Sequence, residues 1–178
     1  MTPGPVVIGY DASESAELAL RRAADLLAPR RAIVAVVWEA GDALEAALLP
    51  TNSLGFVPAR LDLRRAMEDD QAMYERARQL AERGAALARE LGLDAEGLAV
   101  ADDVTVADTL VRLATENDSQ AVVVGAHGHS ALGDLLLGHT AQTVMRHAPC
   151  PVLVVRKHDP SARTGRRESR RSPGATGA

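Results

Sequence analysis

A glycine-bearing segment between two apolar runs constrains the fold of this chain more than any other feature. The first run, Ala121–Val124, leads directly into the glycines, and the second, Val152–Val155, follows the sequence Ala-Pro-Cys-Pro. The glycines have the spacing G-x2-G-x9-G and are Gly125, Gly128 and Gly138. Glycines between a buried strand and a helix let backbone N–H groups and the helix N-terminus surround a phosphate. The segment therefore predicts a strand, a phosphate-binding loop, a short helix over residues 140–147 and a second strand.

Short apolar runs recur along the chain and alternate with helix-like segments. The runs lie near residues 6–10, 32–38, 98–101, 121–125 and 151–155. Helical periodicity follows Ser13 and Thr105 and extends over residues 63–91. Apolar residues make up 47% of the chain but aromatic residues only 2%, so the core must be aliphatic, which suits a parallel sheet with helices on both faces. We expect an α/β fold with a five-stranded, mainly parallel sheet and Val6–Tyr10 at its centre.

Local signals predict where the helices begin and end. The sequence Asp11-Ala12-Ser13-Glu14 has the spacing of a capping box, so Asp11 is interpreted as the cap of the first helix. A second capping box begins at Thr105, and Gly92 is expected to cap the C-terminus of the long helix. Residues 39–60 are expected to form a loop, with a short helical piece near 44–48, because prolines and a glycine interrupt any longer element.

The glycine spacing, its apolar flanks and the closing sequence APCPVLVV together resemble the universal stress protein family over residues 5–156. The resemblance implies the strand order 3-2-1-4-5 in a three-layer sandwich of the adenine nucleotide alpha hydrolase-like or flavodoxin-like type. In this order the strands that precede Asp11 and Gly125 are neighbours, and their connections run in opposite directions. Ligands bind beyond the carboxyl ends of strands at such a switch point, so both residues are expected at the site.

The resemblance also implies a site for ATP, with an accompanying Mg²⁺ ion. In the family, an aspartate after the first strand contacts the nucleoside, and the end of the second strand meets adenine. The glycine segment holds the ribose and the phosphates. Together with neighbouring polar residues of that segment, the predicted nucleotide-binding residues are Asp11, Val37, Gly125, His127, Gly128, Gly138, His139 and Thr140.

One position departs from the family pattern. The residue after Gly138 is expected to be Ser or Thr, but it is His139, and Thr140 follows one position later. The hydroxyl that would contact a phosphate is lost, whereas the backbone N–H at position 139 remains. A protonated imidazole would favour phosphate. A nucleotide-free dimeric interaction protein of the same family is therefore kept as an alternative.

Several of the singled-out residues also have purely structural interpretations. The glycines can serve tight turns alone, and Asp11 can act only as a helix cap. The four histidines between positions 127 and 147 lack the spacing of a zinc site, so no metal site is expected. Cys150 has no basic neighbour that would favour a thiolate, so no catalytic role is expected. Trp38 is expected to pack under the 39–60 loop, and stacking on a base is its alternative role.

The favoured function is that of a regulatory protein of the stress response, which binds a nucleotide and acts as a homodimer. The family implies dimerisation along the edge strand Val152–Val155, and an exposed aliphatic edge would otherwise risk aggregation. A slow ATP hydrolase is a further alternative. Efficient catalysis is not expected, because the Walker A pattern G-x4-G-K-[ST] is absent and no lysine precedes Lys157. The sequence does not identify a regulatory protein partner.

The C-terminal end differs from the rest in composition. Residues 156–178 carry seven Lys or Arg and two Asp or Glu, although the formal charge of the whole chain is −4. We therefore interpret residues 1–157 as the universal stress protein domain and residues 158–178 as a disordered basic tail. The tail has no aromatic residues, and nucleic-acid binding is not expected. We see neither a signal peptide nor a run of about 18 apolar residues, and expect a cytoplasmic protein without membrane contact.

Overall fold

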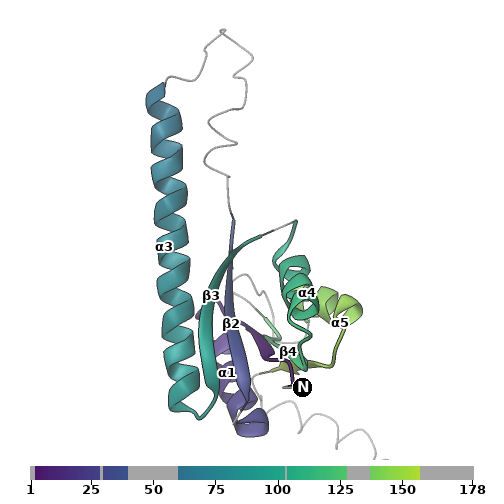
Figure 1. The fold of residues 1–178 in the computed structure, drawn as a ribbon. Coiled ribbons are helices and arrows are strands. Elements are labelled where there is room, and N and C mark those ends of the chain that lie inside the picture. The colour runs from purple at the N-terminus through teal and green to yellow at the C-terminus, as the bar shows by residue number, and fades with distance from the viewer. Residues whose placement is uncertain (1–2, 29, 40–59, 103, 128–136, 157–178) are drawn as a thin grey trace, which may run out of the picture.

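Strands and helices alternate along the chain in a computed structural model that describes residues 3–28, 30–39, 60–102, 104–127 and 137–156 (Figure 1). In chain order these elements are β1 (Val6–Gly9), α1 (Glu14–Leu27), β2 (Arg31–Trp38), α3 (Arg60–Glu90), β3 (Asp94–Ala101), α4 (Val106–Glu116), β4 (Ala121–Gly125), α5 (His139–His147) and β5 (Val152–Val155). None of the helices in these ranges has the length and apolarity needed to cross a membrane.

The strands form one parallel sheet with β1 at its centre. The order is β3-β2-β1-β4-β5, and every neighbouring pair is parallel. Val7 of β1 lies opposite Ile33 of β2 on one side and Val122 of β4 on the other. The α/β class and the strand order expected from the sequence are therefore confirmed.

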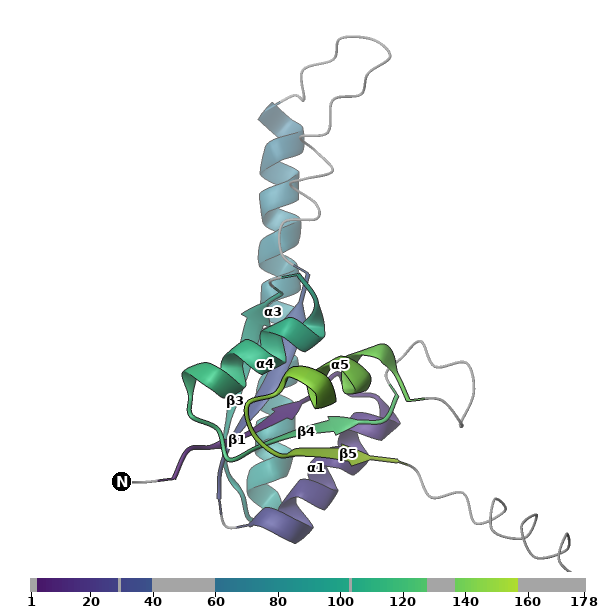
Figure 2. The ribbon, with the colours of Figure 1, turned by 90° about the vertical axis from the view of Figure 1, so that its right-hand side faces the viewer.

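Helices cover both faces of the sheet (Figure 2). Val6 and Ile8 of β1 point toward α1 and α3, whereas Val7 points toward α4 and α5. These three side chains are at most 1% exposed. A central parallel strand must be apolar on both faces because helices bury each of them, which explains the unbroken apolar run in the sequence.

The long helix α3 lies unusually close to the sheet. It has 31 residues and is therefore about 46 Å long, so its amino-terminal half extends beyond the strands (Figure 1). Its carboxyl-terminal half packs on β2 and β3 through glycines. A Cβ atom at Gly97 of β3 would lie 2.6 Å from the carbonyl carbon of Ala81, and one at Gly84 would lie 2.8 Å from Cδ1 of Tyr10. Small residues on both elements allow this close contact.

The start of α1 differs from the prediction. Asp11 is not its N-cap; the cap is Ser13, whose Oγ accepts a hydrogen bond from the N–H of Ala16 at 3.1 Å. Asp11 instead accepts from the N–H of Ser13 at 2.9 Å. The intervening Ala12 has a φ of +59°, so the chain turns sharply between Asp11 and Ser13 before the helix begins. The capping box identified in the sequence therefore starts two residues too early.

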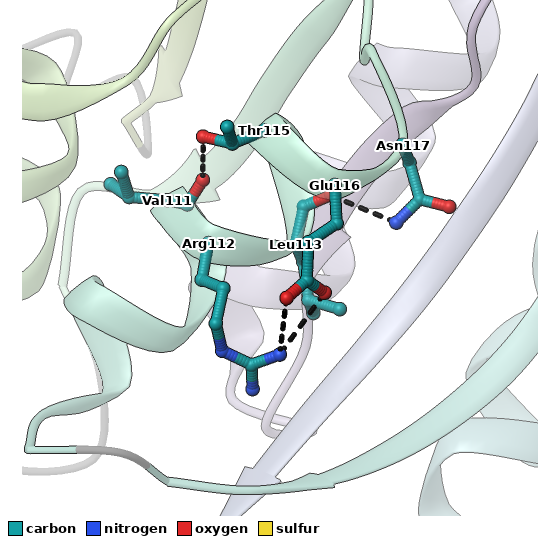
Figure 3. A network of polar contacts seen from close by, with 6 residues as sticks. All are labelled: Val111, Arg112, Leu113, Thr115, Glu116 and Asn117. Carbon is teal, nitrogen blue, oxygen red and sulfur yellow. Dashed lines mark hydrogen bonds and ion pairs between the residues drawn. The ribbon is translucent and has the colours of Figure 1, made fainter.

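Helix α4 begins where the capping box in its sequence predicts, and side chains form hydrogen bonds at both of its ends. Oγ1 of Thr105 accepts from the N–H of Asp108 at 3.1 Å and caps the N-terminus. At the other end, the Asn117 side chain donates to the carbonyl of Leu113 at 2.9 Å (Figure 3). Arg112 and Glu116 form an exposed pair one turn apart, with both carboxylate oxygens 3.1 Å from the same guanidinium nitrogen. The cap contributes more to the helix than this solvated pair does.

Other element boundaries shift by a few residues. Strand β3 begins at Asp94 rather than Leu98, since Asp94 already pairs with Arg31 of β2. The sequence signal is weak there because Ala95 is buried while its two neighbours along the strand are exposed. Helix α3 begins at Arg60 rather than at residue 63, and α5 begins at His139 rather than Thr140. Gly92 has a φ of +94°, which confirms it as the turn residue after α3.

Trp38 packs against α3. Its ring centroid lies 6.0 Å from that of Tyr74, and the two rings are tilted by 59°. The side chain belongs to the α1 and α3 face of the sheet. The helical piece expected near 44–48 and the tail over 158–178 lie outside the described residues, as does the part of the loop under which Trp38 was expected to pack.

Gly97→Ala should lower the free energy of unfolding by about 1–3 kcal/mol, because the added methyl group would overlap the backbone of α3 at Ala81. The matched control is Glu96→Ala on the same strand, where the side chain is exposed and a change within about 0.5 kcal/mol is expected. Urea unfolding of both variants measures the difference. Equal stabilities would show that α3 is not held at this distance from β3.

Candidate functional site

A cleft of about 530 Å³ opens at the carboxyl ends of β1, β2 and β4, beside the N-termini of α4 and α5. A volume of this size is typical of small-molecule sites. The described residues that line it come from all of these elements: Gly9, Tyr10, Asp11, Ser13, Ala16, Ala35, Val37, Glu39, Val106, Leu110, Val124, Gly125, Ala126, His127, Gly138, His139, Thr140 and Ala141.

The cleft brings together seven of the eight residues that the sequence predicted for a nucleotide site. They are Asp11, Val37, Gly125, His127, Gly138, His139 and Thr140. The eighth, Gly128, lies outside the described residues. Their roles toward a ligand stay predictions, but their location at one cleft follows from the topology, since β1, β2 and β4 all end at the same edge of the sheet.

The turn after β1 fixes the position of the Asp11 carboxylate. Its Oδ1 accepts from the N–H of Ser13, and Ser13 in turn caps α1. Ala12 between them adopts a left-handed backbone conformation, which costs about 1–2 kcal/mol in a residue with a Cβ atom. Asp11 is therefore held at the end of β1 by a strained turn, with its carboxylate on the lining of the cleft.

The end of β4 is packed tightly against the first turn of α1. A Cβ atom at Gly125 would overlap Oγ of Ser15 and lie 2.9 Å from the Ser15 carbonyl carbon. Oγ of Ser15 also accepts a hydrogen bond of 3.4 Å from the N–H of His127. Gly125 is therefore required here by contact with α1, a reason that the glycine spacing alone did not reveal.

The N-terminus of α5 points donors at the cleft. Gly138 is its N-cap and provides no side-chain cap, so the first backbone N–H groups of the helix have no cap partner within the described residues. The N–H of Gly138 itself donates to the carbonyl of Ala126 at 2.8 Å, which joins α5 to the end of β4. Uncapped N–H groups at a helix N-terminus bind anions, and they do so whatever the side chain at His139.

Another part of the cleft lining is apolar. Val37 at the end of β2 is half-buried, and Leu110 of α4 is 1% exposed. Val106 at the start of α4 is 41% exposed and completes this side. The cleft thus combines an apolar surface, suited to a flat ring, with the polar N-terminus of α5.

Glu39 is a lining residue that the sequence analysis missed. It follows β2 directly and is exposed at the cleft. The rule that placed Asp11 at the site, a polar residue directly after a strand next to the switch point, also applies to Glu39 and could have found it.

The ionisable side chains of the described lining are the Tyr10 phenol, two carboxylates and two imidazoles. Asp11 and Glu39 provide the carboxylates, and His127 and His139 provide the imidazoles. No Lys or Arg is found among the described lining residues. Within the same described ranges, no three His, Cys, Asp or Glu side chains lie close enough together to hold a metal ion.

Two groups have raised pKa values, which favours their neutral forms: Tyr10 at the cleft, and Cys150, which precedes β5 at the other end of the strands. Burial raises the pKa of the Tyr10 phenol, and the Glu17 carboxylate raises it further. Burial also raises the pKa of the Cys150 thiol, which agrees with the expectation that this cysteine is not a nucleophile.

Comparison with known proteins identifies a family. A family model described as the universal stress protein family matches residues 4–156. A universal stress protein of Thermus aquaticus is 40% identical over 50 residues, and MJ0531 of Methanocaldococcus jannaschii, also named a universal stress protein, is 39% identical over 51 residues. These matches span 28% and 29% of this chain, and 36% and 30% of the two relatives, so the chain aligns with about a third of the length of these curated relatives.

Solved structures share the fold over most of the chain. Hypothetical protein MJ0577 has a TM-score of 0.68 at 19% identity, covering 89% of this chain and 99% of its own. A universal stress protein of Archaeoglobus fulgidus in complex with dAMP has a TM-score of 0.58 at 20% identity, covering 88% and 100%. A universal stress protein in complex with cAMP has a TM-score of 0.52 at 26% identity, covering 88% and 98%.

Gly125→Ala should lower the free energy of unfolding by about 1–3 kcal/mol, because its methyl group would overlap α1 at Ser15. Gly138→Ala is the matched control, since its Cβ would lie 3.2 Å from the nearest atom, the carbonyl oxygen of Ala126, and a loss below about 1 kcal/mol is expected. Adding Ser15→Ala to Gly125→Ala should recover part of the stability, which thermal unfolding measures. A neutral Gly125→Ala would contradict the packing role.

Proposed function

The chain belongs to the universal stress protein family, and on this premise we propose that it is a regulatory protein of the stress response whose cleft binds an adenine nucleotide. The observation that carries the proposal is the convergence of seven predicted site residues on one cleft of about 530 Å³. The family match alone does not show that these side chains lie at one cleft, because it does not locate them in space.

The cleft offers a place for each part of a nucleotide. The adenine would lie on the apolar side formed by Val37 and Val106, and the Asp11 carboxylate would accept a hydrogen bond from the ribose. The phosphate would lie at the uncapped N-terminus of α5, near His139 and Thr140. The loss of the family's hydroxyl at position 139 removes one contact but leaves the backbone donors in place.

Relatives support the choice of an adenine nucleotide as the ligand. Two of the structures described above are complexes, one with dAMP and one with cAMP, and a further relative, from Arabidopsis thaliana, is described with AMP bound. ATP with Mg²⁺ is the ligand that the resemblance to the family implies. Carboxylates at the cleft, those of Asp11 and Glu39, could contact a Mg²⁺ ion carried by the nucleotide.

The arrangement favours binding over catalysis. The described lining residues contain no lysine, and the cysteine outside the cleft has a raised pKa. Nucleotide occupancy would join the turn after β1 to the start of α5 and thereby change the surface that a partner contacts. We propose that the protein regulates its partner through this change of surface with nucleotide occupancy. We also propose that it acts in the cytoplasm.

We also propose that the protein forms a homodimer along β5. This strand is at the end of the described sheet, and three of its four residues are only half-buried. The carbonyls of Pro151 and Val155 accept from the N–H groups of Val122 in β4 and of Ala126 directly after it. Because backbone groups alternate along a strand, the N–H of Val154 faces away from β4 and is free to pair with a second copy.

Gly128→Val should weaken binding of an adenine nucleotide at least about tenfold, because a β-branched side chain would obstruct the approach of the backbone to the phosphate. Gly133→Val, in the same segment but outside the motif, is the matched control and should bind as the wild type does. Isothermal calorimetry measures both affinities, and thermal unfolding checks that both variants fold. If the wild type binds no adenine nucleotide, the nucleotide-free interaction protein becomes the better interpretation.

Val154→Pro should convert the dimer into a monomer, because it removes an outward N–H without touching the ladder to β4. Val154→Thr keeps the N–H and should remain dimeric. Sedimentation velocity of the wild type and both variants at equal concentration gives the answer. A dimeric Val154→Pro protein, or a monomeric wild type, would refute dimerisation through this edge.

A further inference from the structure

We propose that the His139 side chain binds the phosphate of the nucleotide and makes occupancy of the cleft depend on pH, an inference that rests on the proposed function. The family pattern has serine or threonine at this position, and their hydroxyl groups stay neutral throughout the physiological pH range. An imidazole, by contrast, gains a positive charge close to neutral pH. The replacement therefore exchanges a neutral hydrogen-bond donor for a group whose charge changes under physiological conditions.

Hydrogen bonds fix the first turn of α5, and with it His139, at the end of β4. The N–H of Gly138 donates to the carbonyl of Ala126 at 2.8 Å, and the N–H of Gln142 donates to the carbonyl of Gly138 at 3.1 Å. The Gln142 side chain also donates to the carbonyl of Leu137 at 2.6 Å. The His139 side chain is exposed and lines the cleft from this fixed turn. A phosphate that binds the backbone donors of the turn therefore lies beside the imidazole.

Charged groups of both signs surround His139. Asp11 and Glu39 line the same cleft from the strand ends, as does the imidazole of His127. Residues 128–136, which precede α5 in the chain, include His129 and Asp134. On the described elements that pack against α5, the charged side chains lie outside the described lining of the cleft: Asp108, Arg112 and Glu116 on α4, and Arg156 after β5. A test of pH dependence must therefore separate His139 from the two neighbouring histidines.

Phosphate binding and protonation of His139 favour each other. Without a bound anion, the partial positive charge of the α5 N-terminus opposes a second positive charge on the imidazole, whereas the carboxylates of Asp11 and Glu39 favour one. A bound phosphate adds a negative charge at this terminus, and the protonated imidazole then gains an ion pair. By linkage, nucleotide affinity rises as pH falls through the range in which an imidazole titrates, and the gain is lost above that range.

The test measures the affinity of the full chain for AMP by calorimetry at about pH 6 and about pH 8, for the wild type and for His139→Ser. Protonation of AMP itself cancels in the ratio of the two affinities, because both proteins bind the same ligand at each pH. The ratio of wild-type to His139→Ser affinity should be about threefold larger at the lower pH, since an exposed ion pair is weak.

Two further variants show whether the charge at this position is responsible. His139→Lys keeps a cation at both pH values, so its affinity should exceed that of His139→Ser by a similar factor at each. His147→Ser is the matched control at the opposite end of α5 and should bind AMP as the wild type does at both pH values.

The outcomes separate this inference from the function on which it rests. If the ratio of wild-type to His139→Ser affinity is the same at both pH values, the inference is refuted while nucleotide binding stands. If His127→Gln or His129→Gln, rather than His139→Ser, removes the pH dependence, another histidine supplies the charge and the inference is also overturned. An equal loss in His147→Ser would have the same consequence, because the effect would then come from net charge. Absence of AMP binding by the wild type at both pH values would overturn the proposed function and the inference together.

Discussion

The pairing of β1 with both β2 and β4 is the constraint on which the rest of the structure depends. It places the central strand in a fully buried position, where Val6, Val7 and Ile8 are at most 1% exposed. Burial of each such side chain contributes about 1.5–3 kcal/mol, a large part of the stability of a typical domain. The connections from β1 and to β4 cover opposite faces of the sheet, and the crevice between them becomes the cleft.

Much of this arrangement could be predicted from the sequence because it depends on strong local patterns. The apolar runs predicted the strands. The site was predicted from the positions of Asp11 and Gly125, each of which directly follows a predicted strand. The strand order came from the resemblance to the family, since periodicity does not specify which strands are neighbours. Glu39 was missed only because the segment after β2 carries no motif, although its position after a strand at the switch point was informative.

The errors in prediction arise where a tertiary contact or backbone conformation decides the outcome. Asp11 has the spacing of an N-cap, but the left-handed conformation of Ala12 moves the cap to Ser13. The sequence suggested phosphate approach or a tight turn as the reason for Gly125, and only the structure shows that any side chain there would collide with α1. The start of β3 was missed because the covered face of an edge strand gives a weaker apolar signal than a central strand does. None of these features is visible in local composition.

The described part of the cleft offers backbone donors at the N-terminus of α5, where no side chain caps the helix. The hydroxyl groups of Tyr10, Ser13 and Thr140 also line the cleft. Under the proposed function, these backbone donors would let the chain carry His139 in place of the family's hydroxyl residue and still bind a phosphate. The central claim, that this cleft holds one adenine nucleotide, is tested most directly by native mass spectrometry of the full chain mixed with AMP, followed by identification of the small molecule released on heating. The account predicts a mass increase of one AMP per chain and recovery of AMP. A chain mass unchanged by AMP, and equally unchanged by ATP with Mg²⁺, would contradict it.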